Sequence, residues 1–404
     1  MKQTAMDSDV LFLPHEIIRN ILKRLPVKSL IRFQCVCKDW KNLMQNPSFI
    51  VDHLQQSSHQ NPSLLLECKR INIPLPWRLY LLDSGLQVRR VQNSPSNNSS
   101  RNAGIVGSCN GLLCLEIHDF NQSPHPLSLW NPATTAVRHV PRTITDFCDF
   151  YNCVTGFGFS PIVNDYKIVR TYAVFYDVVT KVEVFSLNRG TWKAIDIGNL
   201  KGVRLNSETV TANGAIFWSG VKLVREKKEG EDNIGLQEDE DYIEEAEDKV
   251  DVIVSFDIAK EVFTVIPRPN LDWDADVMLT VYENKLAILC DIWGDEDEIP
   301  DMIYLWVLDE GTCASGDTWS WTKRYTSSPL SCTLDSMAIW RNEIVCKPDS
   351  EEHDDKGRRN VLCMMNLTTN EVKRSVISYC DSILRIYNYV ESLVSVGNNY
   401  IEES

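Results

Sequence analysis

One pattern recurs six times along the chain: an apolar strand, a turn that carries Asn, Asp or Gly, and a second strand. The copies begin at Leu79, Leu127, Val182, Val252, Ile303 and Val361. Once the charged segment 226–249 is set aside, successive copies start 46 to 58 residues apart. A period of about 50 residues is typical of the four-stranded blade of a β-propeller. The repeat therefore predicts a circular array of small antiparallel sheets.

Most copies follow a candidate strand pair that would supply the first half of the same blade. Asn110-Gly111, Asn164-Asp165 and Asn213-Gly214 are turn sequences within three of these pairs. The pairs span 106–117, 156–173, 210–220, 277–292 and 337–347.

The two ends of the repeat region complement each other. The first copy, within 63–91, lacks a preceding pair, and one pair at 384–396 is left over. We predict an all-β propeller of six blades, closed by pairing of N-terminal and C-terminal strands so that no long sheet edge stays open. A β-sandwich or two smaller β domains are the alternatives.

A short helical region precedes the repeats and predicts three helices. Pro14 suits a first helical position, and Pro26 ends the first helix. Between them, one apolar stripe contains Ile17, Ile18, Ile21, Leu22 and Leu25. A unit of fewer than about 40 residues cannot bury so much apolar surface alone. Either the β domain covers it or it docks on another protein. We place this domain at 8–52, a polar linker at 53–62 and the β domain at 63–400.

The formal net charge of −15 argues against nucleic-acid phosphates or anionic lipids as partners. The charge is local. Segment 226–249 has 12 acids and 3 bases, segment 291–301 has 6 acids, and the rest of the chain balances. The first segment reads as a solubilising insertion or as a rim that attracts a basic protein client. The candidate client-binding residues are Glu238, Asp239, Glu240, Asp241, Asp295, Glu296, Asp297 and Glu298.

No motif for catalysis, metal or cofactor binding is complete. His15-Glu16 is followed by Arg19 where a zinc-protease helix needs its second His. Asp272, Asp274 and Asp276 alternate as in a calcium loop, but the sixth position lacks the required Gly. We therefore expect no enzyme activity and no cofactor. The scattered cysteines form no CxxC pair and the N-terminus resembles no signal peptide, so we expect a cytoplasmic or nuclear protein without membrane contact.

The helical region resembles the F-box in its plant form. The similarity rests on Leu13-Pro14, Ile17, Ile18, Ile21, Leu22, the run 25–30 (LPVKSL), Arg32-Phe33, the run 35–38 (CVCK) and Trp40. The remainder resembles the plant F-box-associated, kelch-like domain, through the runs 109–114 (CNGLLC), 129–134 (LWNPAT), 156–159 (GFGF) and 164–169 (NDYKIV). One departure is the absence of the Gly-Gly doublet that marks kelch blades.

The resemblance implies a non-catalytic adaptor function. The F-box would bind a Skp-type adaptor and through it a cullin scaffold, and the propeller would hold a protein substrate for ubiquitination. The adaptor-binding residues implied by the match are Leu13, Pro14, Ile17, Ile21, Leu25, Pro26, Val27, Leu30, Val36 and Trp40. We expect Ile18, Leu22 and Phe33 to pack inside the helical unit instead. The alternative function is an adaptor-bound scaffold that sequesters a partner without degrading it.

Overall fold

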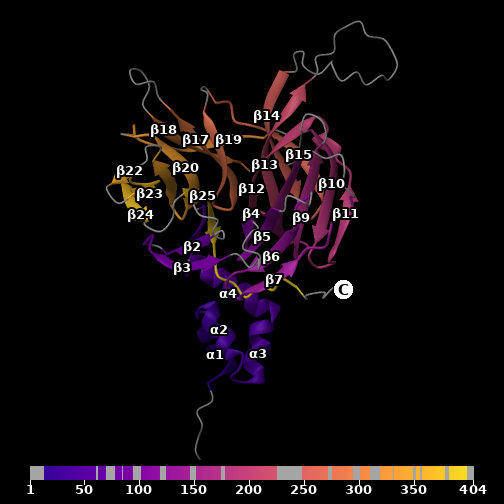
Figure 1. The fold of residues 1–404 in the computed structure, drawn as a ribbon. Helices are drawn as coiled ribbons and strands as arrows, with labels where there is room; N and C mark the ends of the chain where they lie inside the picture. The colour runs from indigo at the N-terminus through magenta and orange to yellow at the C-terminus, as the bar shows by residue number, and fades with distance from the viewer. Residues whose placement is uncertain are drawn as a thin grey trace, which may run out of the picture.

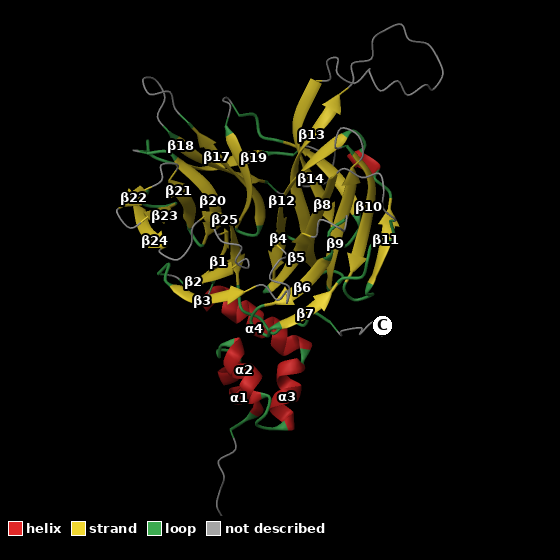
Figure 2. Ribbon diagram, in the orientation of Figure 1, coloured by secondary structure: helices red, strands yellow, loops and turns green. Residues whose placement is uncertain are grey.

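The computed structural model contains a helical domain and a six-bladed β-propeller (Figures 1 and 2). It describes residues 13–60, 62–69, 78–83, 85–93, 102–118, 124–145, 152–173, 178–224, 248–271, 275–293, 301–309, 319–330, 332–348, 352–354, 357–377 and 382–397. The six strand–turn–strand copies all form the third and fourth strands of a blade. The predicted propeller is therefore confirmed.

The blades follow one another along the chain. Blade 1 contains β4 (Asn102–Cys109), β5 (Leu112–His118), β6 (Leu127–Asn131) and β7 (Ala136–His139). Blade 2 contains β8 (Asn152–Ser160), β9 (Asp165–Ala173), β10 (Val179–Ser186) and β11 (Thr191–Ile195), and the 3-10 turn η2 (Gly198–Leu200) follows it. Blade 3 contains β12 (Val203–Ala212), β13 (Ala215–Val224), β14 (Asp248–Asp257) and β15 (Val262–Pro267). Blade 4 contains β16 (Asp276–Tyr282), β17 (Lys285–Ile292), β18 (Met302–Leu308) and β19 (Trp321–Thr326). Blade 5 contains β20 (Leu334–Trp340), β21 (Glu343–Pro348), β23 (Gly357–Asn366) and β24 (Val372–Ile377), with the short β22 (Glu352–Asp354) beside β23.

Blade 6 joins the two ends of the propeller. Its strand order is β25 (Ser382–Tyr389), β1 (Ser63–Lys69), β2 (Arg78–Leu82) and β3 (Val88–Asn93), so the last strand takes the first position. There β25 contacts β20 of blade 5 and β4 of blade 1, which closes the inner ring of strands. Closure by the chain ends is confirmed. The expected strand pair at 384–396 was wrong, because residues 390–397 continue without strand structure.

Tight turns connect the first two strands of several blades. Asn110, Asn164 and Asn213 adopt positive φ angles of 51°, 47° and 47°. Asparagine tolerates this left-handed conformation better than most residues with a side chain. The predicted turn positions are therefore confirmed.

The two ends of the propeller differ. The turn between β6 and β7 packs on the helices through Ala133. Because neighbouring strands in a blade are antiparallel, connections between second and third strands open at the opposite end, away from the helices (Figure 1). Residues 226–247 of the acidic segment belong to such a connection, since β13 ends at Val224 and β14 begins at Asp248.

Residues 13–60, the described part of the helical domain, form four helices rather than the three expected. They are α1 (His15–Leu22), α2 (Val27–Phe33), α3 (Lys38–Gln45) and α4 (Pro47–Gln60). The linker predicted at 53–62 was wrong for residues 53–60, which continue α4. Tertiary contacts outweigh the polar sequence here. The His53 ring is buried with Nε2 3.0 Å from the Leu25 carbonyl oxygen, and the Arg19 guanidinium lies 2.6 Å from the Asp52 carboxylate.

Nine cysteines among the described residues are free thiols, and four of them are buried. Cys68 differs from these nine residues because it is disulfide-bonded. Burial raises the pKa of the Cys290 thiol to about 12, which makes it unreactive at neutral pH.

Gly156 allows blades 2 and 3 to approach closely. A Cβ atom there would lie 2.4 Å from Cζ2 of Trp218 and 2.9 Å from Cγ2 of Ile216, both in β13. We expect Gly156→Ala to lower the free energy of unfolding by roughly 1–3 kcal/mol, because both neighbours are fully buried and cannot move aside. Gly107→Ala is the matched control on inner strand β4, where the nearest atom would be 3.5 Å away. Equal urea midpoints for the two variants would contradict this explanation.

Candidate functional site

An exposed apolar face occupies the helical domain. Leu13, just before α1, is 53% exposed, and Ile17 and Ile21 within α1 are 45% and 48% exposed; the three are spaced four residues apart. Val36, between α2 and α3, is 61% exposed. Isolated exposed apolar residues are ordinary, but a row of them on one helix face is typical of a docking surface.

The other predicted adaptor-binding residues have mixed surroundings. Pro14 and Pro26 are exposed and occupy the N-cap positions of α1 and α2. Leu25 and Trp40 are partly buried, and the Trp40 ring lies edge-on to Phe33 with centroids 5.6 Å apart. Trp40 therefore contributes to packing while part of it stays accessible.

The predicted set of adaptor-binding residues needs correction at Val27 and Leu30, because both are 0% exposed. They belong to the core of the helical domain with Leu22, Met44 and Phe49. They support the exposed face from inside and present no surface to a partner in this conformation. Ile18, Leu22 and Phe33 pack in or against this core, as expected.

Cys35 and Cys37 flank Val36 and are both exposed. The sulfur of Cys37 accepts a hydrogen bond from the Trp40 amide at 3.4 Å, which caps the first turn of α3. The CVCK run indicated this region, but its spacing alone did not reveal the cap. These residues extend the exposed face beyond the predicted set.

The predicted client-binding residues, Glu238 to Asp241 and Asp295 to Glu298, lie outside the described residues. The connections that carry them start at Val224 and at Trp293, in the adjacent blades 3 and 4. Both are connections between second and third strands, at the end of the propeller away from the helices. Trp293, which leads into the second connection, is 57% exposed.

Asp291, the first residue of the second acidic segment, does not belong to an exposed rim. It is 8% exposed in β17, where its carboxylate accepts hydrogen bonds from the Ser336 amide at 2.8 Å and the Ser336 hydroxyl at 2.6 Å. These bonds link blade 4 to blade 5. Burial raises the pKa of Asp291 to about 6, the Ser336 bonds oppose this effect, and Asp335 and Asp276 add to it.

The raised pKa of Asp291 predicts a pH-dependent stability. Because the folded pKa lies above the usual 3.8, protonation favours the folded state. This contribution is complete below pH 3.8 and is lost as the pH rises through about 6. The change amounts to at most about 3 kcal/mol. Asp291→Asn should remove it while keeping a donor and an acceptor for Ser336. Thermal unfolding between pH 4 and 7.5 measures the slope, and the exposed Asp251→Asn is the control.

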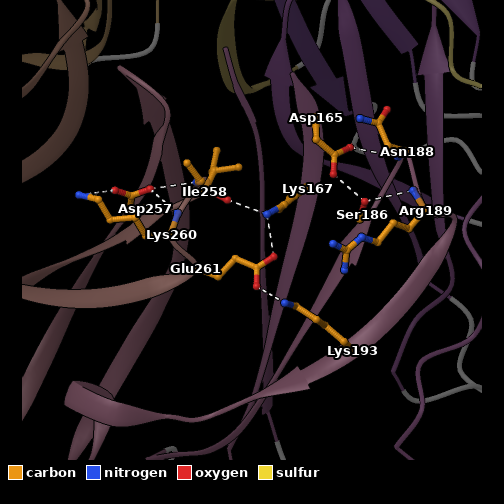
Figure 3. A network of polar contacts seen from close by, with 11 residues as sticks. Asp165, Lys167, Ser186, Asn188, Arg189, Lys193, Asp257, Ile258, Lys260 and Glu261 are labelled. Atoms are coloured by element: carbon orange, nitrogen blue, oxygen red, sulfur yellow. Dashed lines mark hydrogen bonds and ion pairs between the residues drawn. The ribbon is translucent and has the colours of Figure 1, made fainter. Parts of the chain in front are cut away.

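A second polar network links blades 2 and 3 (Figure 3). The Lys167 ammonium donates to the Ile258 carbonyl and to the Glu261 carboxylate, both at 2.7 Å. Lys193 pairs with the other oxygen of Glu261. Lys167 is 6% exposed, so this network is a buried polar link between the two blades.

Within the described ranges, no group of three or more His, Cys, Asp or Glu side chains could hold a metal ion. No helix in the same part of the chain is long and apolar enough to span a membrane.

Two family models match this chain. One, described as the F-box domain, matches residues 10–52, and the other, described as the F-box associated beta propeller domain, matches residues 75–396.

Curated relatives from Arabidopsis thaliana are named as F-box proteins. An F-box protein is 26% identical and aligns over 82% of this chain and 77% of its own length. Two F-box/kelch-repeat proteins are 24% and 23% identical, covering 77% and 96% of this chain and 78% and 95% of their own lengths. Among solved structures, TolB from Acinetobacter baumannii aligns with a TM-score of 0.43 and 9% identity over 85% of this chain and 73% of its own.

Proposed function

Because the chain belongs to the F-box proteins that carry an F-box associated β-propeller domain, we propose that it is the substrate-recognition subunit of a Skp–cullin–F-box ubiquitin ligase. The observation that carries this proposal is the apolar row Leu13, Ile17 and Ile21 with Val36, which the chain leaves exposed. An F-box domain implies a Skp-type adaptor as the occupant of this face. The adaptor would in turn bind the cullin scaffold.

The architecture suggests separate positions for adaptor binding and client binding. The helical domain attaches to one end of the propeller, and the long connections between strands open at the other (Figure 2). Loops at the end of a rigid scaffold are where binding residues concentrate. The adaptor and the client would therefore bind at opposite ends of the molecule, and the protein itself would catalyse no step.

The negative charge of two strand connections favours a basic protein as the client. The connections of blades 3 and 4 carry most of the excess negative charge of the chain in their sequences, and Trp293 at the base of one is an exposed aromatic anchor. Such a surface favours a basic protein and raises its association rate at low ionic strength. We place the protein in the cytoplasm or nucleus, where the ligase machinery works.

The proposed function is tested by capture with and without a proteasome inhibitor. Tagged protein should co-purify the Skp-type adaptor and cullin, together with basic proteins that accumulate when the proteasome is blocked. The half-life of a captured client should lengthen when this protein is removed. Adaptor binding with an unchanged client half-life would instead indicate a scaffold, and absence of adaptor binding would contradict both functions.

A further inference from the structure

The last described residues, Val390 to Gly397, cross the helix-facing end of the propeller. The Ser392 hydroxyl donates to the Asn110 carbonyl at 2.7 Å. A Cβ atom on Gly111 would lie 2.5 Å from both the Ser392 hydroxyl and the Val390 carbonyl oxygen. Val396 packs into the apolar cluster between blades 1 and 2. We call residues 390–397 the C-terminal segment.

This segment also completes the core of the helical domain. Leu393, 8% exposed, and Ala133, 9% exposed, pack in the same apolar cluster as Leu22, Met44 and Phe49. The helical domain is too small to bury its apolar side chains alone. Its core is therefore built partly from the propeller and partly from the end of the chain.

Asn131 joins these parts with both ends of its amide. The oxygen Oδ1 accepts from the amides of Ala133 at 3.0 Å and Thr134 at 3.3 Å, which forms the turn after β6. The nitrogen Nδ2 donates to the carbonyls of Ser392 at 3.1 Å and Val394 at 2.8 Å. Asn131 is 0% exposed, so water cannot replace these bonds.

Two other blades show what the turn itself needs. In blade 3, Oδ1 of Asp257 accepts from the amides of Ala259 and Lys260, both at 2.9 Å. In blade 5, Oδ1 of Asn366 accepts from Thr368 at 2.8 Å and Thr369 at 3.0 Å. A carboxylate or an amide therefore serves the turn equally well. At position 131 the side-chain nitrogen is also required, because it donates hydrogen bonds to two carbonyl oxygens of the C-terminal segment.

We propose that Asn131 is a positioning residue, which fixes the C-terminal segment against the propeller so that Leu393 and Ala133 hold the helical domain in its adaptor-binding form. The inference rests on the proposed function for the identity of the adaptor. Adaptor affinity then depends on a residue of the propeller that lies outside the exposed apolar face.

The test is Asn131→Asp in the full chain, with Asn366→Asp as the matched control. The new carboxylate keeps the acceptor for the turn but directs an anion at two carbonyl oxygens. Loss of the two buried hydrogen bonds from Nδ2 of residue 131 should lower the affinity for the adaptor on the order of tenfold. We expect that loss in calorimetric titration with purified Skp-type adaptor, and faster amide hydrogen exchange in α1 to α4. Asn366→Asp should match the native chain in both measurements.

Acid pH should rescue the Asn131→Asp variant, because a protonated carboxyl regains a donor. Its adaptor affinity relative to the native chain, measured at each pH, should recover as the pH falls toward 5. A purely structural defect would not recover. If Asn131→Asp proves poorly folded, Leu393→Ala is the second variant, and it should loosen the helices while the thermal transition of the propeller stays intact.

Two results would overturn the inference. One is native exchange rates in α1 to α4 for both Asn131→Asp and Leu393→Ala. The other is equal adaptor affinity of Asn131→Asp and Asn366→Asp. Failure of the proposed function would look different. In that case the native chain itself would not bind the adaptor, while the exchange measurement would still report whether Asn131 positions the helices.

Discussion

Replacing Ile17 and Ile21 together with aspartate is expected to abolish binding of the Skp-type adaptor. Both side chains are about half exposed and lie on the same face of α1. Each would lose roughly 1–2 kcal/mol of apolar burial in the complex, and each carboxylate would add a desolvation penalty. The combined effect corresponds to a loss of affinity of at least about 100-fold. Calorimetric titration of the adaptor measures it.

The same double substitution should leave the fold almost unchanged, because neither side chain belongs to the buried core. Val262→Asp is the matched control, since Val262 is 50% exposed but lies on β15 of the propeller. We expect it to retain native affinity. Leu30→Ala provides the opposite contrast, because it should lower stability by removing a fully buried side chain of the helical core. Native-like binding by the double aspartate variant would exclude α1 as the adaptor-binding element.

The strand repeat could be predicted from sequence because its signals are local. Strand periodicity and turn residues such as Asn110 and Asn213 specify hairpins without reference to the rest of the chain. Ring closure was also predictable in outline, from a half-blade at each end. The number of strands at the C-terminus was not predictable, because β25 forms by pairing with β1, more than 300 residues away in the sequence.

The helical domain shows where sequence reasoning ends. Periodicity identified the apolar positions of α1 and α2, but it could not distinguish Ile21, exposed, from Val27 and Leu30, buried. That distinction depends on which face the other helices and Leu393 cover. The polar start of the expected linker continues helix α4 because His53 contacts the Leu25 carbonyl in the turn after α1, and the preceding Asp52 pairs with Arg19 in α1.

The acidic segments show a related limit. The count of acids from 291 to 301 predicts an exposed rim, whereas the strand pattern places 277–292 in a strand pair, and β17 does extend through Ile292 and bury Asp291 between two blades. A count of charges alone does not show which acids lie in a strand. Because Asp291 accepts two hydrogen bonds from Ser336, its carboxylate serves blade packing rather than client attraction.

Removing β25 by ending the chain at residue 381 is expected to prevent cooperative folding. The strand forms seven register pairs with β1 and contacts the inner strands of both neighbouring blades. Ile383, Ile386 and Tyr389 are each at most 8% exposed. Their burial alone contributes roughly 5–8 kcal/mol, which is comparable to the entire stability of a typical domain. Polar contacts would be lost as well, including the hydrogen bond from the Asn388 side-chain nitrogen Nδ2 to the Ile339 carbonyl oxygen at 2.9 Å.

The matched control ends the chain at Gly397, which removes only residues 398–404 and keeps both β25 and the C-terminal segment. This variant should show the native near-ultraviolet circular dichroism spectrum and one sharp thermal transition, whereas the chain ending at 381 should show neither. A closed ring distributes every inner strand between two neighbours, so loss of one strand exposes the facing sides of blades 1 and 5 at the same time. A sharp native-like transition without β25 would mean that five blades and a partial sixth are stable as an open array, and that pairing of the chain ends is dispensable for the fold.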